Sequence, residues 1–162
     1  MAIADFAPED AGTVLGWVRS AEEAEAWASI THLPLHPSIF RRWHLEPGVV
    51  PCLGMVDGEP GAYGEVWEDH DEGEAELARI LVAPERRGHG VGQRFVGLLV
   101  EEARRRGFNE IWVRVAPSNQ AALACYRGAG FARTSRAEEA TFNEGQPRPY
   151  VWMRFGEAAG RA

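Results

Sequence analysis

The feature that most constrains the fold is a glycine-rich turn that links an apolar strand to a helix. Residues 80–92 read ILVAPERRGHGVG, so glycines occupy positions 88, 90 and 92 just before a helical pattern begins. Such a turn directs successive backbone N–H groups toward one point beside the positive end of the helix dipole. The spacing differs from the lysine-containing P-loop and from the GxGxxG turn of dinucleotide-binding folds. The segment therefore predicts a phosphate-binding turn of another type.

Apolar stretches of strand length alternate with turn signals from residue 49 onward. Three strands, predicted to be antiparallel, precede the turn: Val49–Val56, Ala62–Trp67 and Glu74–Val82. After the turn we expect a helix over residues 90–106, a strand over residues 111–115 and a helix from Ser118 or Asn119 to Tyr126. The strands Phe131–Arg136 and Tyr150–Phe155 complete the pattern, joined by a loop over residues 143–149.

The N-terminal third is predicted to be helical. Residues 9–28 are rich in alanine, glutamate, leucine and tryptophan, and prolines then break the pattern into short helices and loops. A chain of 162 residues with 45% hydrophobic content suits one domain over residues 1–162. We expect a variable helical part over residues 1–48 and a core over residues 49–155. The predicted fold class is α/β (α+β), a mixed and mostly antiparallel sheet flanked by helices.

Charge and hydropathy limit the kinds of partner and the location that we expect for this chain. Seventeen Lys and Arg residues against twenty-four Asp and Glu residues give a formal charge of -7, which disfavours a nucleic-acid partner. No run of about 18 apolar residues suggests a membrane span, and the N-terminus lacks a leader pattern, so a cytoplasmic location is expected. A homodimer is left open. His32 and His36 have zinc-like spacing, but intervening Pro34 argues against a continuous helix, and no metal is predicted.

Two motifs resemble those of the GNAT superfamily of N-acetyltransferases. Residues 87–92, RGHGVG, match its pyrophosphate motif Arg/Gln-x-x-Gly-x-Gly/Ala, and residues 119–131, NQAALACYRGAGF, are similar to its Asn-x-x-Ala-x-x-x-Tyr-x-x-x-Gly-Phe segment. The likeness spans roughly residues 50–155. It implies an acetyl-CoA-dependent enzyme that transfers an acetyl group to a primary amine, by direct attack of the amine on the thioester.

The resemblance also implies roles for individual residues. The backbone of Ile80, Leu81 and Val82 would pair with the pantetheine arm as an added strand would. Asn119 would contact the pantetheine, Ala122 would belong to the same site, and Tyr126 would direct its hydroxyl toward the thioester sulfur. The pyrophosphate would be held by Arg87, Gly88, His89, Gly90, Val91 and Gly92.

The base that takes a proton from the amine is less clear. A lysine-like amine has a pKa of ~10.4 and is almost wholly protonated near pH 7. In the ribosomal-protein acetylating branch a glutamate on the strand before the asparagine motif does this, but Arg114 stands there in this chain. In the histone-acetylating branch the glutamate lies four residues before the pantetheine segment, which indicates Glu76, on the same strand face as Ala78 and Ile80. Glu65, on the preceding strand, is the alternative base. Both glutamates could instead be solvated carboxylates of an acidic hairpin that take no part in catalysis.

Two other functions fit parts of the pattern. The chain could be a non-catalytic acyl-CoA-binding regulatory module, because folds do not fix function. A nucleotide-binding protein is also conceivable, although the turn lacks the lysine or ribose-binding acid of such sites. Trp17 and Trp27 lie in the predicted helices that would wall the acceptor cleft, where each could line the pocket or pack in the core. The acceptor is expected to be an amine-bearing small molecule or a protein or peptide, and its identity and the acyl chain length stay open.

Overall fold

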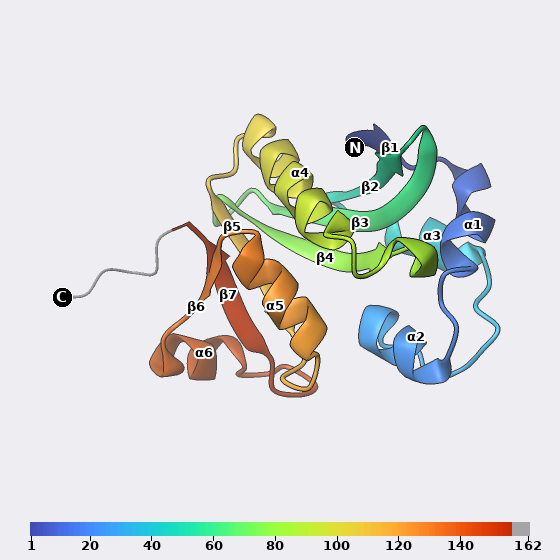
Figure 1. Ribbon diagram of the computed structural model, residues 1–162. Helices are drawn as coiled ribbons and strands as arrows, with labels where there is room; N and C mark the ends of the chain where they lie inside the picture. Colours follow the sequence, from blue (N-terminus) through green and yellow to red (C-terminus); the bar gives the residue numbers. More distant parts are fainter. Residues whose placement is uncertain (157–162) are drawn as a thin grey trace.

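The computed structural model describes residues 1–156 and folds them around one mixed sheet of seven strands, in the order β1-β2-β3-β4-β5-β7-β6 (Figure 1). The strands are β1 (Ala2–Asp5), β2 (Val49–Val56), β3 (Glu59–Asp69), β4 (Glu74–Val82), β5 (Glu110–Val115), β6 (Phe131–Arg133) and β7 (Val151–Phe155). The helices are α1 (Ala11–Leu15), α2 (Ala21–Ala28), α3 (Ser38–Trp43), α4 (Val91–Arg105), α5 (Gln120–Gly128) and α6 (Arg136–Phe142), with short 3-10 turns at Pro8–Asp10 and Pro84–Arg86.

Each face of the sheet has its own apolar core. On one face α4 buries Phe95, Val96 and Leu99 against strands β3 to β7, as its helical periodicity predicts. On the other face α1, α2 and α3 bury Trp17, Trp27 and other aromatic side chains against β2, β3 and the end of β4. Figure 1 shows these first three helices gathered together, away from α4 and α5.

The parallel contact between β4 and β5 is short. It joins residues 74–76 to residues 110–112, and the register ends there. Beyond Glu76, β4 continues along β3 alone, so within residues 1–156 the edge of residues 80–82 that faces β5 has no strand partner. An unpaired strand edge presents backbone N–H and C=O groups that an extended ligand can use.

A bulge in β4 changes which side chains face which core. Gly64 of β3 stands opposite two residues of β4, Arg79 and Ile80, because the register jumps from Glu65↔Ala78 to Tyr63↔Leu81. Arg79 takes a φ of 47°, in the left-handed region. The side-chain alternation therefore inverts. The expectation that Glu76, Ala78 and Ile80 share one face is wrong. Ile80 packs against the core under α4, although it still borders the pocket that Glu76 and Ala78 line.

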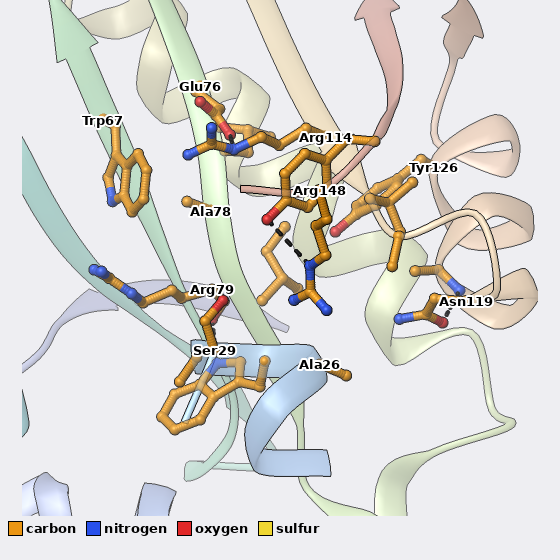
Figure 2. A pocket seen from close by; sticks show the side chains of 18 residues that line it. Ala26, Ser29, Trp67, Glu76, Ala78, Arg79, Arg114, Asn119, Tyr126 and Arg148 are labelled. Carbon is orange, nitrogen blue, oxygen red and sulfur yellow. Dashed lines mark hydrogen bonds and ion pairs between the residues drawn. The ribbon is translucent and has the colours of Figure 1, made fainter. Parts of the chain in front are cut away.

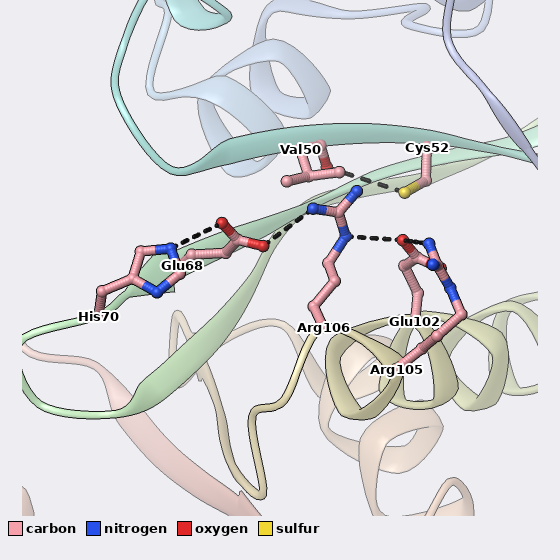
Figure 3. Close-up of polar contacts among 7 residues, drawn as sticks. All are labelled: Val50, Cys52, Glu68, His70, Glu102, Arg105 and Arg106. Carbon is pink, nitrogen blue, oxygen red and sulfur yellow. Dashed lines mark hydrogen bonds and ion pairs between the residues drawn. The ribbon is translucent and has the colours of Figure 1, made fainter.

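Arg106, at the end of α4, ties that helix to the sheet (Figure 3). Its Nε lies 2.6 Å from Oε1 of Glu102, one turn earlier, and its Nη1 donates to Glu68 of β3 at 3.0 Å. Glu68 also contacts His70 at 3.1 Å. The basic last turn of α4 is thus paired with carboxylates as well as placed favourably in the helix dipole.

The structure differs from the sequence expectations at two elements. The N-terminal part is not wholly helical, because residues 2–5 form β1, an edge strand paired with β2. The strand predicted over residues 131–136 ends at Arg133, since Ser135 caps α6 and forms a reciprocal capping box with Glu138. No helix within residues 1–156 is long and apolar enough to cross a membrane.

Candidate active site

A pocket of about 260 Å³ opens where β4 and β5 separate. Its wall is built from α2, the middle of β4, the end of β5, the start of α5 and the loop before β7 (Figure 2). Glu76, Asn119, Ala122 and Tyr126, all expected in the site from sequence, line this one cavity together with Ile80. The fold thus brings the candidate base and the asparagine motif to one place.

Glu76 is the carboxylate that faces the pocket. It lies opposite Trp67 of β3 and Trp112 of β5, and its Oε1 is 2.9 Å from Nε of Arg114. Burial raises the pKa of Glu76 to about 7, although the charge of Arg114 acts in the opposite direction. Glu76 can therefore exchange a proton near neutral pH. Arg114, the residue that replaces the glutamate of the ribosomal-protein branch, has a carboxylate partner on the neighbouring strand.

Glu65, the alternative base, has a different environment. Its side chain is fully buried and accepts hydrogen bonds from the Trp67 indole at 2.6 Å, the Arg79 guanidinium at 2.7 Å and the Tyr63 hydroxyl. Burial favours the neutral acid, but the contact with His44, the charge of Arg79 and these donors hold the pKa of Glu65 below its ordinary value. The Glu65 carboxylate is thus ionised and enclosed, which suits a structural role.

Asn119, Ala122 and Tyr126 follow one face of α5 toward the pocket. Asn119 is the N-cap of this helix, and its Oδ1 accepts from the Ala122 amide at 3.1 Å. Tyr126 lies one turn beyond Ala122 and is half-buried. Burial raises the pKa of Tyr126 well above its ordinary value, with a further contribution from the charge of Glu76. Its hydroxyl therefore keeps its proton at neutral pH.

The glycine-rich turn before α4 has the conformation that the sequence predicts. Gly88 and Gly90 have φ values of 76° and 74°, which favour glycine, and a Cβ at either position would meet no atom within 4 Å. The space over the turn is open. Glycine is favoured at position 92 for a different reason, because a Cβ there would lie 3.3 Å from Cys125 Sγ and 3.4 Å from Val82 Cγ2. Its missing side chain lets α4 pack closely against α5 and β4.

The Arg87 side chain is already engaged within the protein. Its Nη1 pairs with Glu23 of α2 at 2.7 Å, its Nε donates to the Val82 carbonyl at 3.0 Å, and its Nη2 donates to the Trp17 carbonyl at 3.2 Å. His89 Nδ1 contacts the Arg87 carbonyl at 2.8 Å. These contacts stiffen the turn and tie it to the N-terminal helices. In this structure the backbone N–H groups, more than the guanidinium, are what the turn offers to a phosphate.

Trp27 serves both the core and the pocket. Its ring is buried among the N-terminal aromatic side chains and also lines the cavity, and its indole Nε1 donates to the Arg79 carbonyl at 2.6 Å. This hydrogen bond holds the bulge that precedes the unpaired edge of Ile80–Val82. Trp17 is a core residue that contributes its carbonyl to Arg87.

Comparisons with known proteins identify the family. The family model for the Acetyltransferase (GNAT) family matches residues 17–131. Streptothricin acetyltransferase of Streptomyces lavendulae is 31% identical over 129 residues, which cover 65% of this chain and 68% of that protein. The chain belongs to the GNAT acetyltransferase family.

Other GNAT relatives match over shorter segments or through structure. The [Ribosomal protein bS18]-alanine N-acetyltransferase of Escherichia coli (strain K12) is 38% identical over 58 residues, covering 36% of this chain, so the match spans 39% of that relative's length. The aminoglycoside acetyltransferase AAC(6')-Ib, solved with ribostamycin and coenzyme A, superposes with a TM-score of 0.75 at 22% identity, covering 96% of this chain and 93% of that one. This likeness shows the fold.

The residues present fit the acetyl-CoA that a GNAT protein is expected to use. Open space lies over a turn with two left-handed glycines at the N-terminus of a 15-residue helix, which suits a pyrophosphate. The unpaired edge of residues 80–82 leads from that turn to the pocket and suits an extended amide chain. Among residues 1–156, no group of three or more His, Cys, Asp or Glu side chains is arranged to hold a metal ion.

The pocket residues that were not expected from the sequence include four with aromatic or cationic side chains. They are Trp67, Arg79, Arg148 and Tyr150. Arg79 lines the pocket only because of the bulge, which no residue in β4 signals. Arg148 and Tyr150 reach it from the loop between α6 and β7, about 70 residues downstream of Glu76, so their placement depends on the tertiary fold. The one local signal was the two-residue spacing of Glu65 and Trp67, which places both side chains on the same face of their strand.

Proposed function

We propose that this protein is an acetyl-CoA-dependent N-acetyltransferase that transfers an acetyl group to a primary amine. The observation that carries this proposal is the meeting of Glu76 and Tyr126 in one pocket, at the end of an unpaired strand edge that leads from the glycine-rich turn. One group can accept a proton near neutral pH, and the other keeps its proton. A reaction that deprotonates an amine and releases a thiolate needs this pair.

Binding of acetyl-CoA would use mainly backbone groups. The amides of residues 88–92 would hold the pyrophosphate at the positive end of the α4 dipole. The edge of Ile80, Leu81 and Val82 would pair with the pantetheine arm, and Asn119 and Ala122 would form the facing wall of the same channel. Acetyl-CoA supplies an acetyl group activated as a thioester.

Glu76 would accept the proton of the acceptor amine, directly or through a water molecule. An ordinary glutamate with a pKa near 4.3 lies about six units below a lysine-like ammonium, a gap of about 8 kcal/mol. With its pKa raised to about 7, Glu76 reduces that gap to about 5 kcal/mol. Arg114, at 2.9 Å, would hold the carboxylate in place.

Tyr126 would stabilise the departing thiolate. A thiol resembling cysteine has a pKa of ~8.5, so complete transfer of a proton from a tyrosine near 10 runs uphill. The pKa of Tyr126 is raised further by burial. Its hydroxyl would therefore donate a hydrogen bond to the sulfur and keep the proton.

Release of free thiol from acetyl-CoA in the presence of a broad amine panel tests this proposal. An acetyltransferase releases thiol in proportion to acceptor, whereas an acyl-CoA-binding regulatory module binds acetyl-CoA in a calorimeter and releases none. The calorimetric titration thus separates the two functions. Single-domain organisation, a cytoplasmic location and a homodimer stay predictions.

A further inference from the structure

The charge of the pocket is opposite in sign to that of the chain. The whole protein carries a formal charge of -7. Within the described chain, however, the charged pocket-lining residues are three arginines, Arg79, Arg114 and Arg148, and one carboxylate, Glu76. A ligand that enters this cavity meets a cationic wall on an acidic protein.

Two of these arginines are neutralised by close partners. Arg79 lies 2.7 Å from the fully buried Glu65, and its guanidinium stacks on the Trp43 ring with its central carbon 3.9 Å from the ring centroid. Arg114 lies 2.9 Å from Glu76 and also donates to Gln146 at 2.9 Å. Their charges are already used to hold the β4 bulge and to position Glu76.

Arg148 has no comparable partner among residues 1–156. Its Nη1 is 3.6 Å from Glu25 Oε1, and the Glu25 side chain is 52% exposed, so solvent screens this pair. Its Nε donates to the Tyr150 hydroxyl at 3.3 Å. Figure 2 shows its guanidinium directed into the pocket. The fork of N–H groups is available to a planar anion, which it can bind through two parallel hydrogen bonds.

The backbone around Arg148 is fixed in advance. Pro147 and Pro149 flank it, which restricts its backbone and that of its neighbours. Asn143 clamps the end of the loop, with its Oδ1 accepting from the Tyr150 amide at 2.9 Å and its Nδ2 donating to the Tyr150 carbonyl at 2.9 Å. A loop that is already ordered loses little entropy when a ligand binds. This arrangement fits a recognition residue better than a solvated surface arginine.

We propose that the acceptor is a small amine that also carries a carboxylate, such as an amino acid. Arg148 binds the carboxylate, and the amine is thereby directed toward Glu76. The pocket, at about 260 Å³, lies below the usual range of roughly 300–1,000 Å³ for drug-sized ligands, which favours a small acceptor. A polycationic acceptor would bring a like charge against Arg148, whose nearest carboxylate, Glu25, is 3.6 Å away and screened by solvent. This inference rests on the proposed function and specifies its acceptor.

Matched pairs of acceptors test this assignment. Each pair is an L-amino acid and the amine left by removing its carboxylate, and thiol release gives kcat/KM for both, with kanamycin as a polycationic comparison. We expect kcat/KM for each amino acid to exceed that for its decarboxylated partner by at least tenfold. Arg148→Gln should raise KM for the amino acids by at least tenfold, equivalent to about 1.4 kcal/mol. It should leave KM for the decarboxylated amines nearly unchanged, so the preference disappears.

Two further variants control the result. Arg148→Lys keeps the charge but loses the bidentate geometry, and should retain part of the preference. Arg105→Gln removes an arginine that is 69% exposed at the far end of α4, and should change nothing. Calorimetry should give the same acetyl-CoA affinity for the wild type and all three variants, which would show that the variants are folded.

Three outcomes would overturn the assignment. If the wild type turns over the decarboxylated amines or kanamycin at least as well as the amino acids, the protein is an acetyltransferase with another acceptor class. If Arg148→Gln lowers kcat/KM equally for both acceptors of a pair, Arg148 does not bind the carboxylate. If acetyl-CoA binds and no amine releases thiol, the proposed function fails, and this inference fails with it.

Discussion

At the residue scale, two glutamates of the same acidic region differ through their surroundings. Glu65 is enclosed by donors that keep the pKa of its carboxylate low, whereas Glu76 has one arginine partner and a pKa that burial raises to about 7. Environment assigns such roles elsewhere in enzymes that use two carboxylates. The sequence indicated both residues as candidate bases but could not tell their roles apart. The groups that surround the Glu65 carboxylate come from β3, from β4 and from His44 at the C-terminus of α3.

Glu76→Gln should remove the pH dependence that this carboxylate causes. A base must be ionised to work, so the wild-type kcat/KM should rise with pH through about 7, where Glu76 loses its proton. The variant should lack the inflection near 7 and depend only on the fraction of neutral amine, which keeps growing with pH. It should be slower at pH 8 by roughly 10²–10⁴-fold. Glu72→Gln, in the exposed turn before β4, is the control. Overlapping pH profiles for wild type and Glu76→Gln would assign the base to another group or to water.

Tyr126→Phe should affect turnover more than binding. The ring still packs against Phe131, whose centroid is 6.0 Å away, while the hydrogen bond to the leaving sulfur is lost. We expect kcat to fall by about 10–100-fold, the low end for acid–base assistance, with unchanged acetyl-CoA affinity by calorimetry. A variant that loses affinity and keeps kcat would instead make Tyr126 a wall of the channel.

At the element scale, the bulge in β4 decides where the strand edge becomes free. Several contacts hold Arg79 in its left-handed conformation. They include the ion pair with Glu65, the hydrogen bond from Trp27 to its carbonyl, and the packing of its guanidinium over the Trp43 ring. The bulge inverts the alternation of β4, so Leu81 packs under the N-terminal helices while Ile80 faces α4. The N-terminal helices thus help to shape the expected acetyl-CoA site as well as the acceptor side.

Glu65→Gln tests this coupling. The change leaves Arg79 with its charge uncompensated in a largely buried position, and breaking such a pair typically costs 3–5 kcal/mol. Because Arg79 is partly exposed, we expect the free energy of unfolding to fall by about 3 kcal/mol. The affinity for acetyl-CoA should fall as well. Glu59→Gln, at the exposed start of β3, should alter neither, and a stable Glu65→Gln protein with full affinity would refute the coupling.

Gly90→Val tests the glycine-rich turn, with Gly58→Val as a matched control. Both glycines have positive φ and open space where a Cβ would be, but Gly58 lies in the turn between β2 and β3. Each variant should therefore lose similar stability through backbone strain. Only Gly90→Val should weaken acetyl-CoA binding by at least tenfold in calorimetry, about 1.4 kcal/mol. Equal acetyl-CoA affinities for the two variants would show that this turn does not bind the phosphate groups.

At the scale of the whole molecule, the sequence predicted what local patterns encode. The glycine turn, the amphipathic α4 and the asparagine cap of α5 each have a signature within a few residues, and the structure has all three. The capping box at Ser135 was also readable and was missed. The β4 bulge and the position of Arg148 have no local signature, because they arise from contacts between segments far apart in the chain. Those long-range contacts therefore complete the site in ways that the local sequence does not encode.

The most direct measurement of the central claim is the mass of the product. The protein is incubated with acetyl-CoA that carries an isotopic label in its acetyl group and with an amine acceptor, and the acceptor is then analysed by mass spectrometry while free thiol is counted. The account predicts one labelled acetyl group on the acceptor nitrogen for each thiol released, with both quantities lowered by Glu76→Gln. Bound acetyl-CoA that stays intact with every acceptor, or thiol release without a labelled amine, would contradict it.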